Sequence, residues 1–150
     1  MTMLGMRYET VTLLDGAAKC RGLLAQAFAE AGTPNQSVWF NESLYASLDY
    51  TQSFGLIAWD GESIAGFISV FVLPATHFDG LVASNDVLFV LPPYRNSLLA
   101  GRLMSLAESE AKRRGAVLFQ WAANESSPLD KALSKRSSYR LFQKVFTKEL

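Results

Sequence analysis

The sequence has one cysteine, one histidine and no apolar run long enough to cross a membrane. A single cysteine, Cys20, excludes an internal disulfide, and we expect it to be a small buried helix residue. Every apolar run falls short of the ~18 residues that a transmembrane helix needs. The start, MTMLGMRYET, lacks the apolar stretch of a secretory signal. These absences predict a cytoplasmic protein without a membrane partner.

Excess charge of one sign is also absent, because fourteen Lys and Arg balance fourteen Asp and Glu. No global field therefore recruits nucleic acid, and no nucleic-acid partner is expected. The last twenty residues are locally basic, which is typical of a solvated face but also fits a small nucleic-acid-associated module. With 150 residues, 49% of them apolar, the chain is predicted to form a single domain, 1–150, around one core.

The first half of the chain predicts a strand, two helices and a hairpin. Residues 7–13 alternate as a half-buried strand does, and 15–32 carry apolar residues at helical spacing before a terminal glycine. A loop over 33–40 precedes a short helix over 41–50, with Asn41 as its N-cap. Next, Asp60 and Gly61 separate two apolar runs, which predicts an antiparallel hairpin.

The second half predicts a strand-helix-strand crossover. A strand over 81–91 precedes a long amphipathic helix over 96–115, and 116–122 form an almost continuous apolar strand. Ser127, followed by proline, begins a short helix, and 139–150 alternate as a final strand. This order predicts a mixed α/β fold with a parallel strand pair in its second half.

The segment LFVLPPYRNSLLAGRLM, residues 88–104, joins the strand to the long helix. The first turn of a helix leaves N–H groups unpaired, and the helix dipole adds partial positive charge there. Residues 96–101 would supply these donors to an anion, and Arg102 could add a charge-assisted contact. Leu98 is tolerable in such a site if its side chain turns away and its φ is helical.

The same segment resembles the signature of the GCN5-related N-acetyltransferase (GNAT) family. The matching residues are Leu88, Val90, Pro92, Tyr94, Arg95 and Ala100, while Leu98 stands where the family has its first glycine. The resemblance covers nearly the whole chain. It implies a central mixed, mostly antiparallel sheet with one parallel strand-helix-strand unit and flanking helices. It also implies an acetyl-CoA-dependent N-acetyltransferase acting on a primary amine of unknown identity.

The resemblance further implies where acetyl-CoA would bind. The helix start would hold the pyrophosphate, the strand backbone would pair with the pantetheine arm, and a residue after the next strand would contact that arm. No metal is implied. The implied cofactor-binding residues are Leu88, Phe89, Val90, Arg95, Asn96, Ser97, Leu98, Leu99, Ala100, Gly101, Arg102 and Asn124.

Acetyl transfer from a thioester to an amine needs a base, an acid and an N–H donor for the carbonyl. The backbone near Val90 would supply the donor. Ser134 aligns with the tyrosine that the family uses as acid, so Tyr139 is the nearest replacement, unless it packs as the first residue of the last strand. Asp86 and His77 are the candidate bases, although Asp86 also fits a capped bulge and His77 an ordinary surface histidine.

The acceptor would be a small-molecule or peptide amine. Trp39, Phe40, Tyr45 and Tyr50 lie where the family walls its acceptor pocket, and Glu42 or Asp49 would suit a cationic amine. Aromatic residues at helical spacing equally fit a core. An exposed last strand is compatible with a homodimer. The missing glycine and tyrosine favour an alternative, a catalytically weak or inactive acyl-CoA-binding or structural protein.

Overall fold

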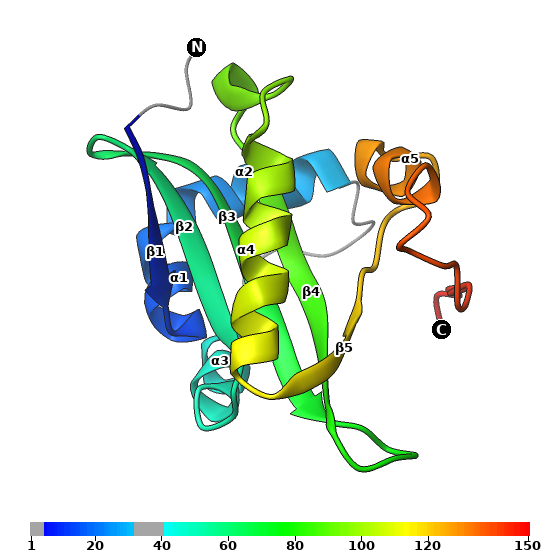
Figure 1. The fold of residues 1–150 in the computed structure, drawn as a ribbon. Helices are drawn as coiled ribbons and strands as arrows, with labels where there is room; N and C mark the ends of the chain where they lie inside the picture. The colour runs from blue at the N-terminus through cyan, green and yellow to red at the C-terminus, as the bar shows by residue number, and fades with distance from the viewer. Residues whose placement is uncertain (1–4, 32–40) are drawn as a thin grey trace.

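A computed structural model describes residues 5–31 and 41–150 of the chain, whose strands form one sheet (Figure 1). The strands lie in sequence order from β1 to β5. Neighbours are antiparallel except for β4 and β5, which are parallel. The predicted mixed α/β fold is therefore confirmed. The strands are β1 (Met6–Val11), β2 (Phe54–Asp60), β3 (Ser63–Pro74), β4 (Leu81–Val90) and β5 (Ala116–Gln120).

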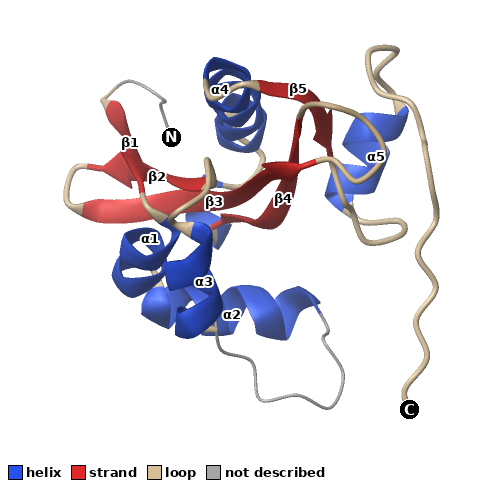
Figure 2. Ribbon diagram, turned by 90° about the horizontal axis from the view of Figure 1, so that it is seen from below, coloured by secondary structure: helices blue, strands red, loops and turns tan. Residues whose placement is uncertain are grey.

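Helices cover both faces of the sheet. Three short helices lie on one face and the long helix α4 lies on the other, with α5 beyond the end of β5 (Figure 2). Within residues 5–31 and 41–150, no helix is long and apolar enough to span a membrane. The helices are α1 (Leu13–Lys19), α2 (Arg21–Ala31), α3 (Glu42–Leu48), α4 (Leu99–Arg113) and α5 (Pro128–Ser134), with a 3-10 turn, η1 (Pro92–Tyr94), before α4.

The apolar residues pack into two clusters, one on each face of the sheet. Leu99, Leu103 and Ala107 of α4 pack against the first face, and each is fully buried. On the second face, Leu13 of α1 packs with Ile57 of β2. The central strands β2 and β3 are thus covered on both sides, which explains their nearly continuous apolar sequences.

Two predicted connections are confirmed. Asp60 pairs with Ser63 across the β2–β3 turn, where Gly61 has a φ of +60°, a conformation that glycine adopts readily. Helix α4 crosses from β4 to the parallel β5, as the sequence order predicts.

The helix predicted over 15–32 is two helices in the structure. Thr12 is the N-cap of α1, where its side chain accepts from the N–H of Asp15, so the first helix begins earlier than predicted. Cys20 leaves the helical conformation, and α2 begins at the next residue. Apolar spacing alone missed this break, because Ala17 and Ala27 are both buried on the same side of the sheet.

The helix predicted to begin at Asn96 begins instead at Leu99. Asn96 has a φ of +62°, a left-handed conformation that asparagine tolerates better than most residues. Leu98 then takes the N-cap position without a capping side chain. The first helical turn is therefore displaced toward Ala100 and Gly101.

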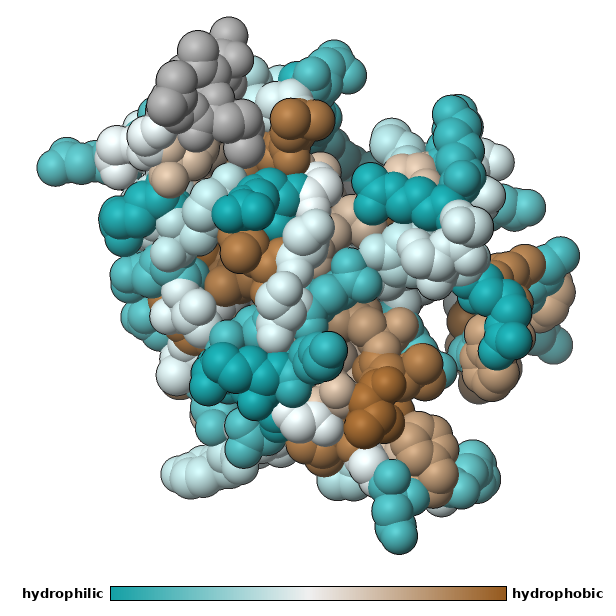
Figure 3. Space-filling view, in the orientation of Figure 1, coloured by the Kyte–Doolittle hydropathy of each residue, from teal (hydrophilic) through white to brown (hydrophobic). Residues whose placement is uncertain are grey.

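The predicted final strand is wrong. Residues 139–150 form no strand in the structure, and their apolar side chains are mostly exposed, with Phe142 at 72% and Phe146 at 89%. Alternation marks side chains that need burial, but a strand also needs a neighbouring strand to bond with. Figure 3 shows apolar side chains gathered over β5 and, separately, on the C-terminal segment. On β5 they include Val117, which is 67% exposed.

Candidate active site

The parallel strands β4 and β5 diverge after Ser84, the last residue of β4 that pairs with β5. At this point the side chain of Asn85 replaces the missing strand partner. Its Nδ2 donates to the carbonyl of Ala122 at 3.0 Å, and its Oδ1 accepts from the N–H of Ala122 at 2.7 Å. The separation of the two strands is thus fixed by a side chain.

Beyond this divergence, the backbone of β4 is bonded to β3 on one side only. The N–H of Leu91 donates to Ala65 of β3. Because backbone groups in an antiparallel strand alternate in direction, those of Leu88 and Val90 face away from β3. The carbonyl of Val90 accepts from Nε of Arg95 at 2.8 Å. The N–H groups of Leu88 and Val90 thus face the side on which β5 has separated.

Helix α4 follows β4 after η1, and part of its first turn is open. Oγ of Ser97 accepts from the N–H of Leu99 at 3.2 Å. Among the described residues, the N–H groups of Ala100 and Gly101 have no partner, and the helix dipole concentrates partial positive charge there. Leu98 has a φ of −83° and is 79% exposed, so its backbone does not require glycine.

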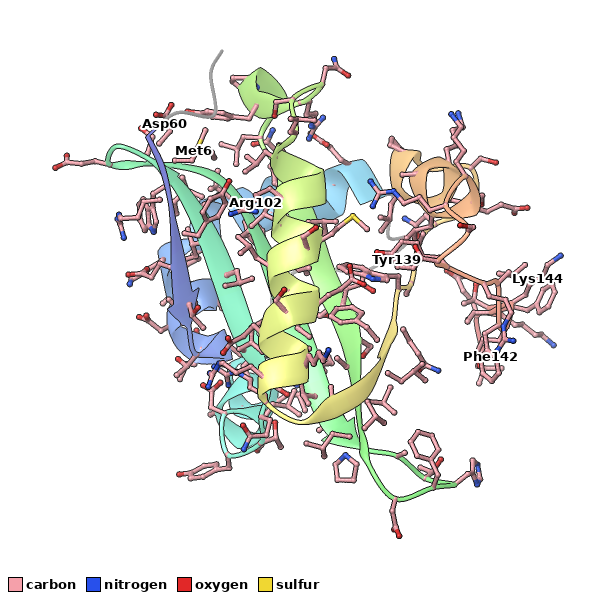
Figure 4. The ribbon with its side chains drawn as sticks, in the orientation of Figure 1. Met6, Asp60, Arg102, Tyr139, Phe142 and Lys144 are labelled. Carbon is pink, nitrogen blue, oxygen red and sulfur yellow. The ribbon has the colours of Figure 1, made fainter. Side chains whose placement is uncertain are left out.

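Three arginines lie near this helix start, and Arg136 comes close to Gly101 in the open turn. A Cβ added to Gly101 would lie 4.0 Å from Nη2 of Arg136, which comes from the segment after α5. The predicted ligand Arg95 instead pairs with Glu30 of α2 at 2.6 Å. Arg102 lies over the ring of Tyr8, on the β1 side of α4 (Figure 4). Phosphate contacts by Arg95 and Arg102 stay predictions.

The candidate base Asp86 lies at a bulge in β4. Ser69 pairs with Val87 and the next residue of β3 pairs with Asn85, so Asp86 is the extra residue. Its Oδ2 accepts from Oγ of Ser69 at 3.2 Å and from the hydroxyl of Tyr45 on α3. Ser69 also accepts from the N–H of Val87 at 3.1 Å. The bulge turns an exposed carboxylate toward the α3 face of the sheet.

The electrostatic environment keeps Tyr45 protonated. Burial, followed by the hydrogen bond to Asp86, raises the pKa of the Tyr45 phenol above its ordinary value. The hydroxyl is therefore a donor to Asp86 throughout the physiological pH range.

The candidate acid Tyr139 lies on the opposite face of the sheet. Its hydroxyl donates to Oε1 of Glu108 on α4 at 2.8 Å (Figure 4). Burial and this bond raise the pKa of Tyr139. It does not begin a last strand. Ser134, which aligns with the tyrosine of the resembled family, instead contacts Asp130 within α5.

Two other candidate residues lie apart from these groups. His77 is exposed in the loop between β3 and β4, at the end of β4 remote from α4's first turn, and the structure does not bring it to Asp86. Asn124 is exposed after β5, and its carbonyl accepts from the N–H of Ser127.

Several predicted residues of the acceptor wall have other roles. Trp39 and Phe40 lie outside the described residues. Tyr50 is 95% exposed after α3. Glu42 pairs with an arginine of α2 at 2.7 Å. Asp49 accepts from the first N–H groups of α1, so it caps that helix.

No group of three or more metal-ligating side chains occurs in the parts of the chain that the structure describes.

A family model described as the acetyltransferase (GNAT) family matches residues 24–132. The chain belongs to this family. Solved structures agree on the fold. An aminoglycoside acetyltransferase from an uncultured soil metagenomic sample is 17% identical, with a TM-score of 0.76 over 97% of both chains. Ribosomal-protein-alanine N-acetyltransferase from Brucella melitensis biovar Abortus 2308 is 13% identical, with a TM-score of 0.68 over 97% of this chain and 99% of that one. No curated protein matches this sequence.

Within this GNAT domain, sequence reasoning missed several residues of the site. Ser69 interrupts the apolar run of β3, and Asn85 precedes Asp86 where polar residues interrupt β4, so both carry a readable signal. In the sequence, Arg136 is one of several basic residues near the C-terminus. Tyr45 fits either a pocket wall or the core, and only the fold reveals its contact with Asp86.

Proposed function

We propose that this GNAT-family protein transfers an acetyl group from acetyl-CoA to a primary amine. The observation that carries the proposal is the open first turn of α4 at the end of β4. The unpaired N–H groups of Ala100 and Gly101 suit a pyrophosphate, because such a site depends on backbone donors and needs no particular side chain. Arg136 adds a cation beside the same turn.

The remaining groups along the divergence of β4 and β5 fit the arm of the same molecule. The N–H groups of Leu88 and Val90 suit the amides of pantetheine, as an added strand would. Nε1 of Trp121, just after β5, is buried without a partner among the described residues. A buried donor of this kind is costly unless a ligand or water accepts from it. Acetyl-CoA would supply the thioester that is attacked.

Asp86 is the proposed general base. Its carboxylate takes a proton from the acceptor nitrogen, the new C–N bond forms as the C–S bond breaks, and the departing thiolate takes a proton. Tyr139 is the candidate donor of that last proton, and the N–H of Val90 is the candidate donor to the acyl oxygen. The carboxylate of Asp86 lies on the α3 face of the sheet, and Tyr139 lies on the α4 face. The acceptor and the cofactor would thus approach β4 from different sides.

Binding and turnover test the proposal separately. Isothermal titration with acetyl-CoA measures the cofactor site, and release of free thiol with a panel of primary amines measures transfer. The panel includes an aminoglycoside and a peptide with N-terminal alanine, because an aminoglycoside acetyltransferase and a ribosomal-protein-alanine N-acetyltransferase share the fold. We expect micromolar binding, and turnover that Asp86→Asn reduces by at least about 100-fold.

The same experiments can overturn the proposal. Absence of acetyl-CoA binding would contradict it outright. Binding without turnover of any amine would favour the alternative, an acyl-CoA-binding or structural protein. The engagement of Tyr139 with Glu108 is the observation that favours that alternative.

A homodimer also stays a proposal. Two features support self-association. Residues 139–150 leave apolar side chains exposed, and β5, at the edge of the sheet, leaves backbone hydrogen-bonding groups without a neighbouring strand. Location in the cytoplasm and the absence of a nucleic-acid partner stay predictions from the sequence.

A further inference from the structure

The two carboxylate oxygens of Asp86 have different surroundings. Oδ2 accepts from two hydroxyls, one from Tyr45 on α3 and one from Ser69 on β3. The structure gives Oδ1 no partner among the described residues, and Asp86 is exposed at its bulge. One oxygen is thus bound in place, while the other remains accessible.

We propose that Tyr45 and Ser69 are positioning residues that hold Asp86 so that Oδ1 accepts the proton of the acceptor amine. This inference rests on the proposed function. A carboxylate on an exposed bulge has several rotamers, and a base works only when it lies within hydrogen-bond reach of its proton. Two donors on the same oxygen select one orientation and leave the other oxygen for the substrate.

Tyr45 is well placed to impose this orientation, because it is rigid. Its side chain is 6% exposed, and its ring lies edge-on to Phe71 with centroids 6.2 Å apart. Its backbone N–H donates to the carbonyl of Asn41 at the start of α3. A buried ring on a capped helix loses little further freedom when its hydroxyl binds Asp86.

A purely structural role for Tyr45 makes a different prediction. If the hydroxyl only tied α3 to β4, its loss would lower stability equally whether residue 86 is Asp or the uncharged Asn. Turnover would then fall only in proportion to the folded fraction. A positioning role instead lowers kcat in the fully folded protein and depends on the carboxylate of Asp86.

The test is Tyr45→Phe, which removes one oxygen and keeps the buried ring. We expect kcat to fall by about 10-fold or more, with KM for the amine changed less than about threefold. Acetyl-CoA affinity should be unchanged, because Tyr45 lies on the face opposite α4. Ser69→Ala should give a smaller loss of kcat. Ser47→Ala is the matched control: it removes an exposed hydroxyl from the same helix, one that donates to the carbonyl of Ser43, and it should leave kcat as in wild type.

A double-mutant cycle with Asp86→Asn completes the test. If Tyr45 acts through Asp86, Tyr45→Phe has no further effect on kcat in the Asp86→Asn protein. Independent, multiplicative losses would overturn the inference, as would wild-type kcat in Tyr45→Phe. These outcomes differ from failure of the proposed function, in which the wild-type protein itself transfers no acetyl group.

Discussion

The two ends of α4 are built in opposite ways. At the C-terminal end, Glu110 pairs with Arg113 at 2.6 Å and with Arg114 at 2.8 Å, and Arg114 also bonds to the carbonyl of Gln52 before β2. At the N-terminal end, Leu98 supplies no capping side chain, and the N–H groups of Ala100 and Gly101 are left without partners in the described structure.

This difference separates stability from binding within one helix. Charged groups at the C-terminal end satisfy one another and anchor the helix to the sheet. The N-terminal end concentrates backbone donors that only an external anion would satisfy. Substitutions at one end should therefore change stability with little effect on acetyl-CoA affinity, and substitutions at the other end should do the reverse.

The strongest test of this separation is Gly101→Asp. A carboxylate in the first turn favours the helix, and replacing a helical glycine also adds stability, so the midpoint of thermal unfolding should stay or rise. The same charge would repel a phosphate and compete for Arg136, so acetyl-CoA affinity should fall by at least about 100-fold in calorimetry. Gly101→Asn, equal in size but uncharged, is the control. Equal losses in both variants would mean that shape, and not charge, excludes the ligand.

The second prediction concerns the other end of the helix. The hydrogen bond from Arg113, supported by Arg114, lowers the pKa of Glu110 from 4.5 to about 2. Glu110→Gln should therefore cost about 1–2 kcal/mol of unfolding free energy at neutral pH. Because the folded pKa is depressed, this difference should be complete above pH 4.5 and should disappear as the pH falls toward 2.

Urea unfolding of wild type and Glu110→Gln between pH 2 and 7 measures this difference. Acetyl-CoA affinity at neutral pH should match that of wild type. A difference in stability that persists unchanged down to pH 2 would mean that the ion pairs are not its source.

Arg136→Gln should weaken acetyl-CoA binding by about tenfold, because it removes one charge-assisted contact beside the open turn. The salt dependence of binding should fall with it. Lys135→Gln removes the same charge from the neighbouring exposed residue and is the control. If both variants bind alike, Arg136 acts only through general charge.

The smallest effect is expected for Leu98→Gly, which restores the family's glycine. Leu98 already has a negative φ and an exposed side chain, so affinity should change by less than about threefold in calorimetry. A gain well beyond this would show that the leucine side chain obstructs the ligand.

Much of this arrangement was predictable from the sequence. The hairpin at Gly61, the crossover through α4 and the N-cap at Ser127 each depend on local chemistry that neighbouring residues determine. Asp86 was readable as a polar interruption of an apolar strand. The features that the sequence did not predict correctly depend on residues distant in the chain. Residues 139–150 alternate as a strand does but pair with no strand in the described structure, and the approach of Arg136 to Gly101 brings together segments 35 positions apart.

The side-chain clip from Asn85 to Ala122 has a consequence for how a ligand would enter. Two adjacent parallel strands tend to hydrogen-bond along their whole length, and a molecule that binds between them would first have to separate them. Here the amide of Asn85 satisfies both backbone groups of Ala122, so the strands are held apart before any ligand arrives. The separation of the strands is therefore preorganised, and binding does not have to supply the free energy of opening it.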